Sequence, residues 1–172
     1  SVRKQRKGRR VRVEQGEQIF KGHRSYDLMI CLQTGLQHSI TKHSRDSKSK
    51  LTDEDFLAKH DVKFPREGSP STPPHPTGDF TWKDYSPAVF TKLRESWGLD
   101  AGETLRSICG GQGLREFGTP GKSSSVFYVS HDNRFIIKTM RKFEMKALIE
   151  MLPKYYLHCT SHDSTLLTKF FG

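Results

Sequence analysis

Residues 118–152 read GTPGKSSSVFYVSHDNRFIIKTMRKFEMKALIEML and carry the strongest fold signal in the chain. A glycine-containing loop leads into a β-forming run at 126–129, and residues 131–133 follow as a turn. A second apolar run at 134–139 contains one lysine, and an amphipathic helical pattern comes after it. This order predicts an antiparallel hairpin with a phosphate-binding loop in front of it.

The loop at residues 120–125 has the composition of an anion site. Its small side chains let backbone N–H groups come close to a phosphate, and its serine hydroxyls supply further donors. The predicted phosphate ligands in this loop are Gly121, Lys122, Ser123, Ser124 and Ser125.

A Walker A motif is excluded. That motif requires GxxxxGK[ST], and although Gly121, Lys122 and Ser123 match its end, the first glycine position holds Glu116. A strand pattern also follows the loop, where a P-loop begins a helix. A loop above a hairpin is instead typical of protein-kinase-like folds.

Lys138 is the one lysine of the second strand, which it shares with Ile136 and Ile137. Alternation along a strand places Lys138 on the face of Ile136, opposite Phe135 and Ile137. Beneath a phosphate loop, a lysine at this position has an evident anionic ligand. The alternative is that Lys138 lies at a frayed strand end and reaches solvent.

The helix after the hairpin is predicted from a stripe of apolar residues at Met145, Leu148, Ile149 and Leu152. Glu144 lies beside this stripe, so it is the predicted partner of Lys138 in an ion pair of the kinase type. Pro153 is expected to end the helix.

Charge and composition limit the remaining possibilities. The chain has 172 residues, 33% of them hydrophobic, which suits one domain, or one lobe of a larger unit, with long polar appendages. Its net charge of +10 lies mainly in residues 1–21, which we expect to be a disordered basic tail. Such a tail indicates affinity for a polyanion without saying which one. The three cysteines contain no CxxC pair, so neither a zinc site nor a disulfide framework is expected.

Two further regions are expected after the tail and before residue 79. Residues 22–43 form a helical region in which the apolar stripe runs from Ser25 to Ile40. This helix packs either on its own domain or on a second subunit. Residues 44–78 are expected to be a flexible linker rich in proline and serine, with a short helical pattern at 52–58 that Thr52 could cap. In the region 79–172, Ser86 and Asp100 are predicted N-caps, and Gly98 is a predicted C′ residue.

Several joined motifs resemble, in the same order, the N-terminal half of the phosphatidylinositol phosphate kinases, especially those that phosphorylate phosphatidylinositol 4-phosphate on its 5-hydroxyl. They read SYDLMICLQTGL, FPREGSPSTPPH, FTWKDYSPAVFTKLRESWGLD, GKSSSVFYVSHDNRFIIKTM, EMKALIEMLPKYYLH and TLLTKFFG, and they cover most of residues 22–172. The resemblance implies an α+β fold, the N-terminal lobe of a protein-kinase-like lipid kinase, with an antiparallel sheet, flanking helices and no C-terminal lobe.

The resemblance also implies an activity and its cofactors. A kinase of this family transfers a phosphoryl group from ATP to phosphatidylinositol monophosphate at a membrane surface, with Mg²⁺ as the metal. Lys138 matches the family's ATP-contacting lysine, and Gly121 to Ser125 match its phosphate loop. The family's loop usually reads GKSGS, and Ser124 replaces the second glycine, a change expected to weaken ATP binding. No catalytic residue and no metal ligand is identifiable in this chain, so we expect it to be inactive alone.

Two alternatives stay open from the sequence. One is a 4-kinase acting on phosphatidylinositol 5-phosphate. The other is a non-catalytic module that binds acidic lipid or dimerises through residues 25–40, with lipid contacts from the tail and from Lys138, Arg141, Lys142 and Lys146. Nucleic-acid binding is least favoured, because no reading motif accompanies the tail. The expected location is the cytoplasm, peripheral at the plasma membrane, with the nucleus as a further location suggested by the tail.

Overall fold

A computed structural model of the chain describes residues 16–45, 48–118, 125–162 and 164–172. Its helices are α1 (Tyr26–Arg45), α2 (Asp53–Leu57), α3 (Pro87–Ser96), α4 (Ala101–Cys109) and α5 (Lys142–Ser161). Its strands are β1 (Glu17–Gln18), β2 (Lys59–Phe64), β3 (Phe80–Tyr85), β4 (Arg115–Gly118), β5 (Val126–Val129) and β6 (Ile136–Lys138).

The strands form two antiparallel sheets. One has the order β1-β4-β5-β6, and the other is a ribbon of β2 and β3. Consecutive strands β4, β5 and β6 are neighbours, as expected for a meander with short connections. Mixed helices and antiparallel strands confirm the predicted α+β class.

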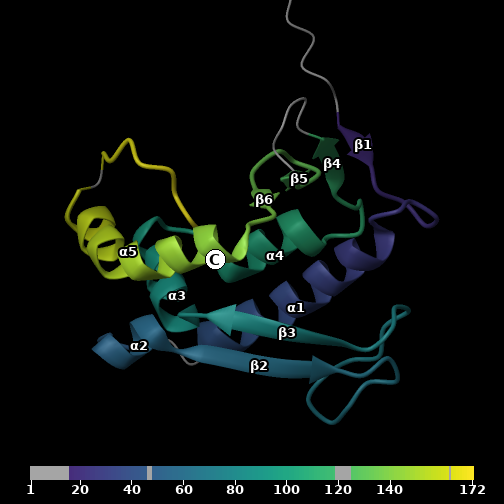
Figure 1. Cartoon of the computed structure of the whole chain (residues 1–172), viewed down its shortest axis with the longest axis horizontal. Coiled ribbons are helices and arrows are strands. Elements are labelled where there is room, and N and C mark those ends of the chain that lie inside the picture. Colours follow the sequence, from purple (N-terminus) through teal and green to yellow (C-terminus); the bar gives the residue numbers. More distant parts are fainter. Residues whose placement is uncertain (1–15, 46–47, 119–124, 163) are drawn as a thin grey trace, which may run out of the picture.

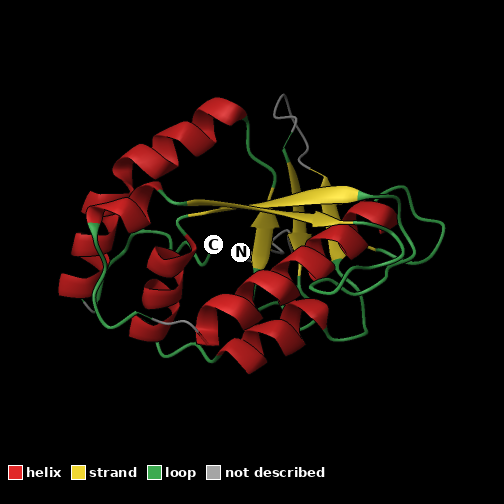
Figure 2. Ribbon diagram, turned by 90° about the horizontal axis from the view of Figure 1, so that it is seen from below, coloured by secondary structure: helices red, strands yellow, loops and turns green. Residues whose placement is uncertain are grey.

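Helix α1 lies between the two sheets, with the four-stranded sheet on one side and the β2–β3 ribbon on the other (Figure 1). The ribbon strands run across those of the four-stranded sheet (Figure 2). Toward the larger sheet, α1 contributes Met29 to a core with Ile108, Leu114 and Tyr128. Leu32 and Leu36 pack against this core and Ile40 is buried, whereas Leu28 is 46% exposed. Most of the predicted stripe therefore packs within the chain.

Toward the ribbon, α1 approaches β3 through a glycine. A Cβ added at Gly35 would lie 2.1 Å from the Cε3 atom of Trp82. Glycine lowers helix propensity by about 1 kcal/mol relative to alanine. Close packing of the Trp82 indole explains why α1 contains a glycine at this position.

A second core joins α3 to α5 at the end of the molecule where α2 also lies (Figure 1). Val89, Leu93 and Leu152 are fully or almost fully buried in it. The C-terminal segment returns to this core, because the Tyr155 hydroxyl donates to the Thr168 carbonyl at 2.8 Å and accepts from Phe170 N at 2.9 Å.

The region expected to be a flexible linker, residues 44–78, contains ordered structure. It holds α2, where the short helical pattern was expected, and Thr52 is its N-cap residue. It also holds the whole of β2, which pairs with β3 from Lys59↔Tyr85 to Phe64↔Phe80. Beyond β2, His75 is buried and its Nδ1 lies 2.8 Å from Thr77 Oγ1. The sequence KHDVKF did not resemble a strand because charged residues occupy its exposed face, and its pairing partner lies some twenty residues away.

The predicted tail, residues 1–21, also extends less far than expected. Glu17 and Gln18 pair with β4 as strand β1, and Ile19 is buried in the core beside Leu114. The basic run from Arg3 to Arg12 lies outside the described residues.

Two of the predicted helix caps behave differently from each other. Asp100 caps α4 as predicted, because its side chain accepts from Glu103 N at 2.9 Å. Ser86 occupies the N-cap position of α3, but its hydroxyl donates to the Phe56 carbonyl at 2.7 Å instead of capping the helix. Its backbone φ of 49° lies in the left-handed region.

The prediction that Pro153 ends the last helix is wrong. Helix α5 continues through it to Ser161. Beyond the proline, Tyr155 and Cys159 are buried against α3, and this packing outweighs the missing Pro153 hydrogen bond. No helix in the described part of the chain is long and apolar enough to cross a bilayer.

Candidate functional site

The hairpin of β5 and β6 sets the position of Lys138. Lys138 is opposite Phe127, and just beyond it Thr139 N donates to the Val126 carbonyl at 3.0 Å. The Thr139 hydroxyl also accepts from Val126 N at 2.9 Å. These two bonds fix the end of β6 beside the start of β5, so Lys138 lies next to the base of the loop.

The N-terminal end of the loop lies at the same level of the sheet as its C-terminal end. Gly118, the last residue of β4, pairs with Val126. Residues 119–124, with the predicted ligands Gly121, Lys122, Ser123 and Ser124, lie outside the described residues. Ser125 is described and directly precedes β5. The structure thus places both ends of the predicted phosphate loop at the sheet edge that carries Lys138.

Lys138 and Glu144 form the ion pair that the sequence predicts. Lys138 Nζ lies 3.1 Å from Glu144 Oε1, with 38% of the lysine side chain and 30% of the glutamate side chain exposed. The other carboxylate oxygen of Glu144 accepts from Arg141 N at 2.7 Å at the start of α5. The hydrogen bond from Arg141 N, followed by that from Lys138, lowers the pKa of Glu144. The lysine is a charged group at an accessible surface, able to meet an anionic ligand.

Exposed apolar residues lie near this pair in the sequence. Ile136, on the same face of β6 as Lys138, is 65% exposed, and Phe143 at the start of α5 is also 65% exposed. Met140 between them is 43% exposed. A lysine framed by exposed apolar groups suits a ligand or partner that has both an anionic and an apolar part.

Glu116 is a residue whose role the sequence did not reveal. Its side chain is buried on β4, and it accepts hydrogen bonds from Arg24 Nη2 at 2.5 Å and from the Ser25 hydroxyl. Burial alone would raise its pKa, but these two donors and the positive charge of Arg24 lower it. The sequence did contain one indication of this role, an acidic residue within the β4 segment. Glu116 attaches β4, which leads into the loop, to the start of α1.

Asp132 is a second such residue, in the turn of the hairpin. Its Oδ1 accepts from the Ser107 hydroxyl at 2.6 Å and from the Ser130 hydroxyl at 2.7 Å. Burial acts to raise its pKa, but these bonds and one from Arg134 N lower the pKa to about 2. Because Ser107 belongs to α4, Asp132 holds the hairpin turn against that helix.

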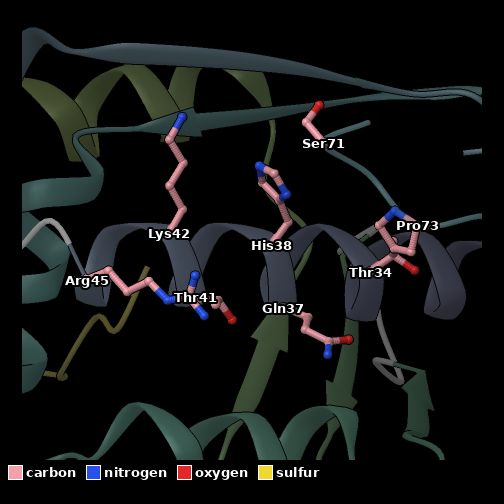
Figure 3. A pocket seen from close by; sticks show the side chains of 8 residues that line it. All are labelled: Thr34, Gln37, His38, Thr41, Lys42, Arg45, Ser71 and Pro73. Carbon is pink, nitrogen blue, oxygen red and sulfur yellow. The ribbon is translucent and has the colours of Figure 1, made fainter. Parts of the chain in front are cut away.

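The described residues contain no group of three or more His, Cys, Asp or Glu side chains that could hold a metal ion. Two open cavities among the described residues, of about 540 and 620 Å³, lie beside α1 and β2, and Figure 3 shows the side chains that line the smaller one. The chemistry available at the candidate site is thus the binding of an anion at a surface, by Lys138 and the adjoining loop.

Fold and site together define the class: an α+β unit in which a lysine of the sheet pairs with a glutamate of the following helix, beside a loop of phosphate-binding composition. Comparison with known proteins shows which family this class of fold and site resembles. Residues 108–172, which include this site, match the model of the family described as Phosphatidylinositol-4-phosphate 5-Kinase.

Relatives extend the similarity beyond that region. Phosphatidylinositol 4-phosphate 5-kinase 9 of Arabidopsis thaliana is 48% identical over 177 residues, covering 100% of this chain and 22% of the relative. The Arabidopsis 5-kinase 7 is 47% identical and covers 95% of the chain and 22% of the relative. Phosphatidylinositol 4-phosphate 5-kinase 1 of Oryza sativa subsp. japonica is 48% identical, covering 91% of the chain and 21% of the relative.

These comparisons confirm the predicted resemblance to the phosphatidylinositol phosphate kinases, and they place it along the whole chain. The chain spans about a fifth of the length of these relatives. The relatives are named as kinases, and the similarity to them includes the Lys138 hairpin and α5.

Proposed function

We propose that this chain is the N-terminal, nucleotide-binding part of a lipid kinase that converts phosphatidylinositol 4-phosphate to phosphatidylinositol 4,5-bisphosphate at a membrane surface. The observation that carries the proposal is the Lys138–Glu144 ion pair, 3.1 Å long, at the base of the loop. The names of the relatives support the 4-phosphate as substrate, in preference to the 5-phosphate.

In this proposal, Lys138 binds a phosphate oxygen of ATP, and Glu144 orients the lysine. Phosphoryl transfer is catalysed mainly by positioning and by neutralising charge, so a lysine held at a fixed place is the contribution expected of this lobe. Gly121 to Ser125 donate hydrogen bonds to the phosphates. A bound Mg²⁺ would supply further neutralisation of the phosphate charge; the described residues contain no group of three or more His, Cys, Asp or Glu side chains that could hold it.

The test uses a chimera, because the chain alone is expected not to turn over. The matching segment of the Arabidopsis 5-kinase 9 is replaced by this chain, and phosphorylation of phosphatidylinositol 4-phosphate is measured with ATP and magnesium. The chimera should be active, and Lys138→Met should lower kcat/KM by about 100-fold or more, the scale of losing one charge-stabilising group.

The matched control is Lys83→Met. Lys83 lies on β3 in an exposed ion pair with Asp61, at 3.2 Å, so it shares the chemistry of Lys138 but belongs to the other sheet. Activity of Lys83→Met should stay within about twofold, the range of surface substitutions. An active Lys138→Met chimera, or equal losses in both variants, contradicts the proposal. Phosphatidylinositol 5-phosphate in a parallel assay distinguishes the 4-kinase alternative.

A second function, binding to an anionic membrane, is favoured by the surface at the start of α5. Phe143 is 65% exposed and Met140 43% exposed, and the basic residues Lys142 and Lys146 are exposed beside them. Basic side chains next to exposed apolar ones suit a lipid headgroup region. This function gives the proposed location, peripheral at the plasma membrane on its cytoplasmic side.

Sedimentation with vesicles tests the membrane proposal in the full chain. Phe143→Ser should reduce binding to vesicles of phosphatidylcholine containing phosphatidylserine, and Lys142→Glu should reduce it further at low salt. Leu57→Ser is the matched control, since Leu57 is 74% exposed on α2 and is not one of the residues of this surface. Equal binding by all three variants would refute the role of this surface.

A further inference from the structure

The segment of residues 164–172 joins the two hydrophobic cores. Phe170 packs in the core of α3 and α5, where its ring centroid lies 5.4 Å from that of Tyr155. The adjacent residue, Phe171, packs instead in the core of the four-stranded sheet, with its ring edge-to-face on Phe135 at 5.3 Å between centroids. In Figure 1 the C-terminal end of the segment lies between α3 and β6. Two neighbouring side chains thus connect the helical core to the sheet.

Arg94 on α3 holds the backbone of this segment. Its Nη1 donates to the Phe171 carbonyl at 2.5 Å, and its Nη2 donates to the Thr91 hydroxyl at 2.9 Å. Arg94 is only 8% exposed, and burial lowers the pKa of its guanidinium, although the charges of Asp84 and Glu95 act to raise it. No described residue forms an ion pair with Arg94, so this buried cation is bound by a carbonyl and a hydroxyl.

Stability alone does not explain an arginine at this position. Burying a charge carries a desolvation cost, and an apolar side chain of similar volume often packs as well or better. Such a side chain would lack the donors that the guanidinium supplies in a fixed plane. Because those donors determine where their acceptors lie, Arg94 sets the position of the Phe171 backbone relative to α3.

The contact between Phe171 and Phe135 connects this constraint to the strand of the candidate site. Phe135 is 4% exposed and directly precedes β6, whose last residue is Lys138. The backbone of Phe135 is bound to Ser130, since Phe135 N donates to Ser130 Oγ at 3.0 Å and Ser130 N donates to the Phe135 carbonyl at 3.0 Å. The strand that ends at Lys138 therefore begins next to a side chain packed on Phe171.

From these contacts we propose that Arg94 is a positioning residue for the lysine site. By holding Phe171 against Phe135, Arg94 fixes the start of β6 and thereby the place at which Lys138 meets the nucleotide. The inference rests on the function proposed above, in which Lys138 binds a phosphate oxygen of ATP. The role predicts an effect of Arg94 on the affinity for ATP and none on the affinity for the lipid.

The first experiment measures amide hydrogen exchange in the chain itself. Arg94→Met removes both donors and keeps an unbranched stem. It should speed exchange about tenfold at Phe135 and Thr139, whose N–H groups are bonded within the hairpin, and leave the β2–β3 ribbon unchanged. Lys92→Met is the matched control, because Lys92 is a cation of the same helix, paired with Glu95 at 2.7 Å, and should leave both regions unchanged. Unchanged exchange in the hairpin, or equal acceleration in hairpin and ribbon, would overturn the proposal.

The second experiment uses the chimeric kinase and separates two KM values. Arg94→Met should raise the KM for ATP by about tenfold and leave the KM for phosphatidylinositol 4-phosphate within about twofold. Phe171→Leu keeps the carbonyl but loses the ring contact with Phe135, so it should act in the same direction. Because the two residues act through one contact, the double variant should exceed the larger single effect by no more than about twofold. Arg94→Lys keeps one donor and should recover part of the affinity for ATP.

Failure of this inference is distinguishable from failure of the proposed function. A fall in kcat with both KM values unchanged would show only a loss of folded enzyme, and it would overturn the role of Arg94. If Lys138→Met lowers activity as expected while Arg94→Met and Phe171→Leu leave the KM for ATP unchanged, the inference fails and the proposed function stands. If Lys138→Met leaves the chimera fully active, both fail.

Discussion

Gly35 on α1 touches the indole of Trp82 on β3, and no side chain fits between them: a Cβ at Gly35 would lie 2.1 Å from Cε3 and 2.2 Å from Cδ2. The contact joins the helix to the β2–β3 ribbon. It makes the size of residue 35 a determinant of stability.

Gly35→Ala should therefore destabilise the chain. Alanine gains about 1 kcal/mol of helix propensity, but overpacking of a buried site costs about 1–3 kcal/mol, and this overlap is severe. We expect a net loss of about 1–2 kcal/mol in urea unfolding followed by circular dichroism. Gly78→Ala is the control, because nothing lies within 4 Å of a Cβ at that position. Trp82→Leu combined with Gly35→Ala should recover part of the loss; no recovery would locate the strain elsewhere.

Asp132 should make stability depend on pH in the acid range. Its pKa is about 2 in the folded chain and 3.8 ordinarily, so the folded state favours the charged form. The stability that it contributes is fully present above pH 3.8 and is lost as the pH falls toward about 2. Asp132→Asn should cost about 1 kcal/mol at neutral pH.

The measurement for Asp132 is the difference in unfolding free energy between the wild type and Asp132→Asn as a function of pH. This difference should be constant near neutrality and should shrink below about pH 4. Asp27→Asn, an exposed acid of α1, serves as the control. A difference that grows as the pH falls would show that the hydrogen bonds from Ser107 and Ser130 do not favour the carboxylate.

Glu144 has two separable roles, and two variants distinguish them. One carboxylate oxygen accepts from Arg141 N, and the other from Lys138 Nζ. Glu144→Gln keeps an acceptor for Arg141 N but removes the charge, whereas Glu144→Ala removes both. Amide exchange in the first turn of α5 should be about fivefold faster in Glu144→Ala than in Glu144→Gln.

In the chimeric kinase, both Glu144 variants should lose activity to a similar degree, because each loses the ion pair with Lys138. The activity assay with ATP and phosphatidylinositol 4-phosphate checks this expectation. If Glu144→Gln keeps full activity, the charge of Glu144 is not needed and only its cap matters.

Pro153→Ala should stabilise the chain. Proline inside a helix costs about 3 kcal/mol relative to alanine, and its stiffening of the unfolded chain returns only about 1 kcal/mol. Since Pro153 is exposed, no packing is lost, and we expect a gain of about 2 kcal/mol in thermal or urea unfolding. The neighbouring Lys154→Ala should change stability by less than about 0.5 kcal/mol. A loss on Pro153→Ala would mean that a bend at this residue is needed to seat Tyr155 against α3.

Local signals in the sequence were sufficient for part of this fold. The stripe of α1, the Ser86-Pro87 start and Gly98 end of α3, and the hairpin of β5 and β6 are encoded by neighbouring residues, and the structure contains all of them. Lys138 and Glu144 were paired correctly because they are only six residues apart, on adjoining elements.

Features that depend on distant partners were not predictable in this way. Strand β2 becomes recognisable only in register with β3, where Asp61 is opposite Lys83 and Val62 opposite Trp82. The burial of Glu116 depends on Arg24 and Ser25, more than ninety residues earlier.

The pairing of Gly118 with Val126 has a consequence for how the loop between them can vary. The pairing of β4 with β5 holds both ends of that loop together. The hydrogen bonds and packing of this strand pair therefore offset the entropy that is lost when the loop is closed. For a closed loop, even a doubling of its length costs only about 0.6 kcal/mol. Substitutions or insertions between Gly118 and Val126 are therefore expected to cost little in folding free energy, so the sequence there can vary while the sheet that holds its two ends stays the same.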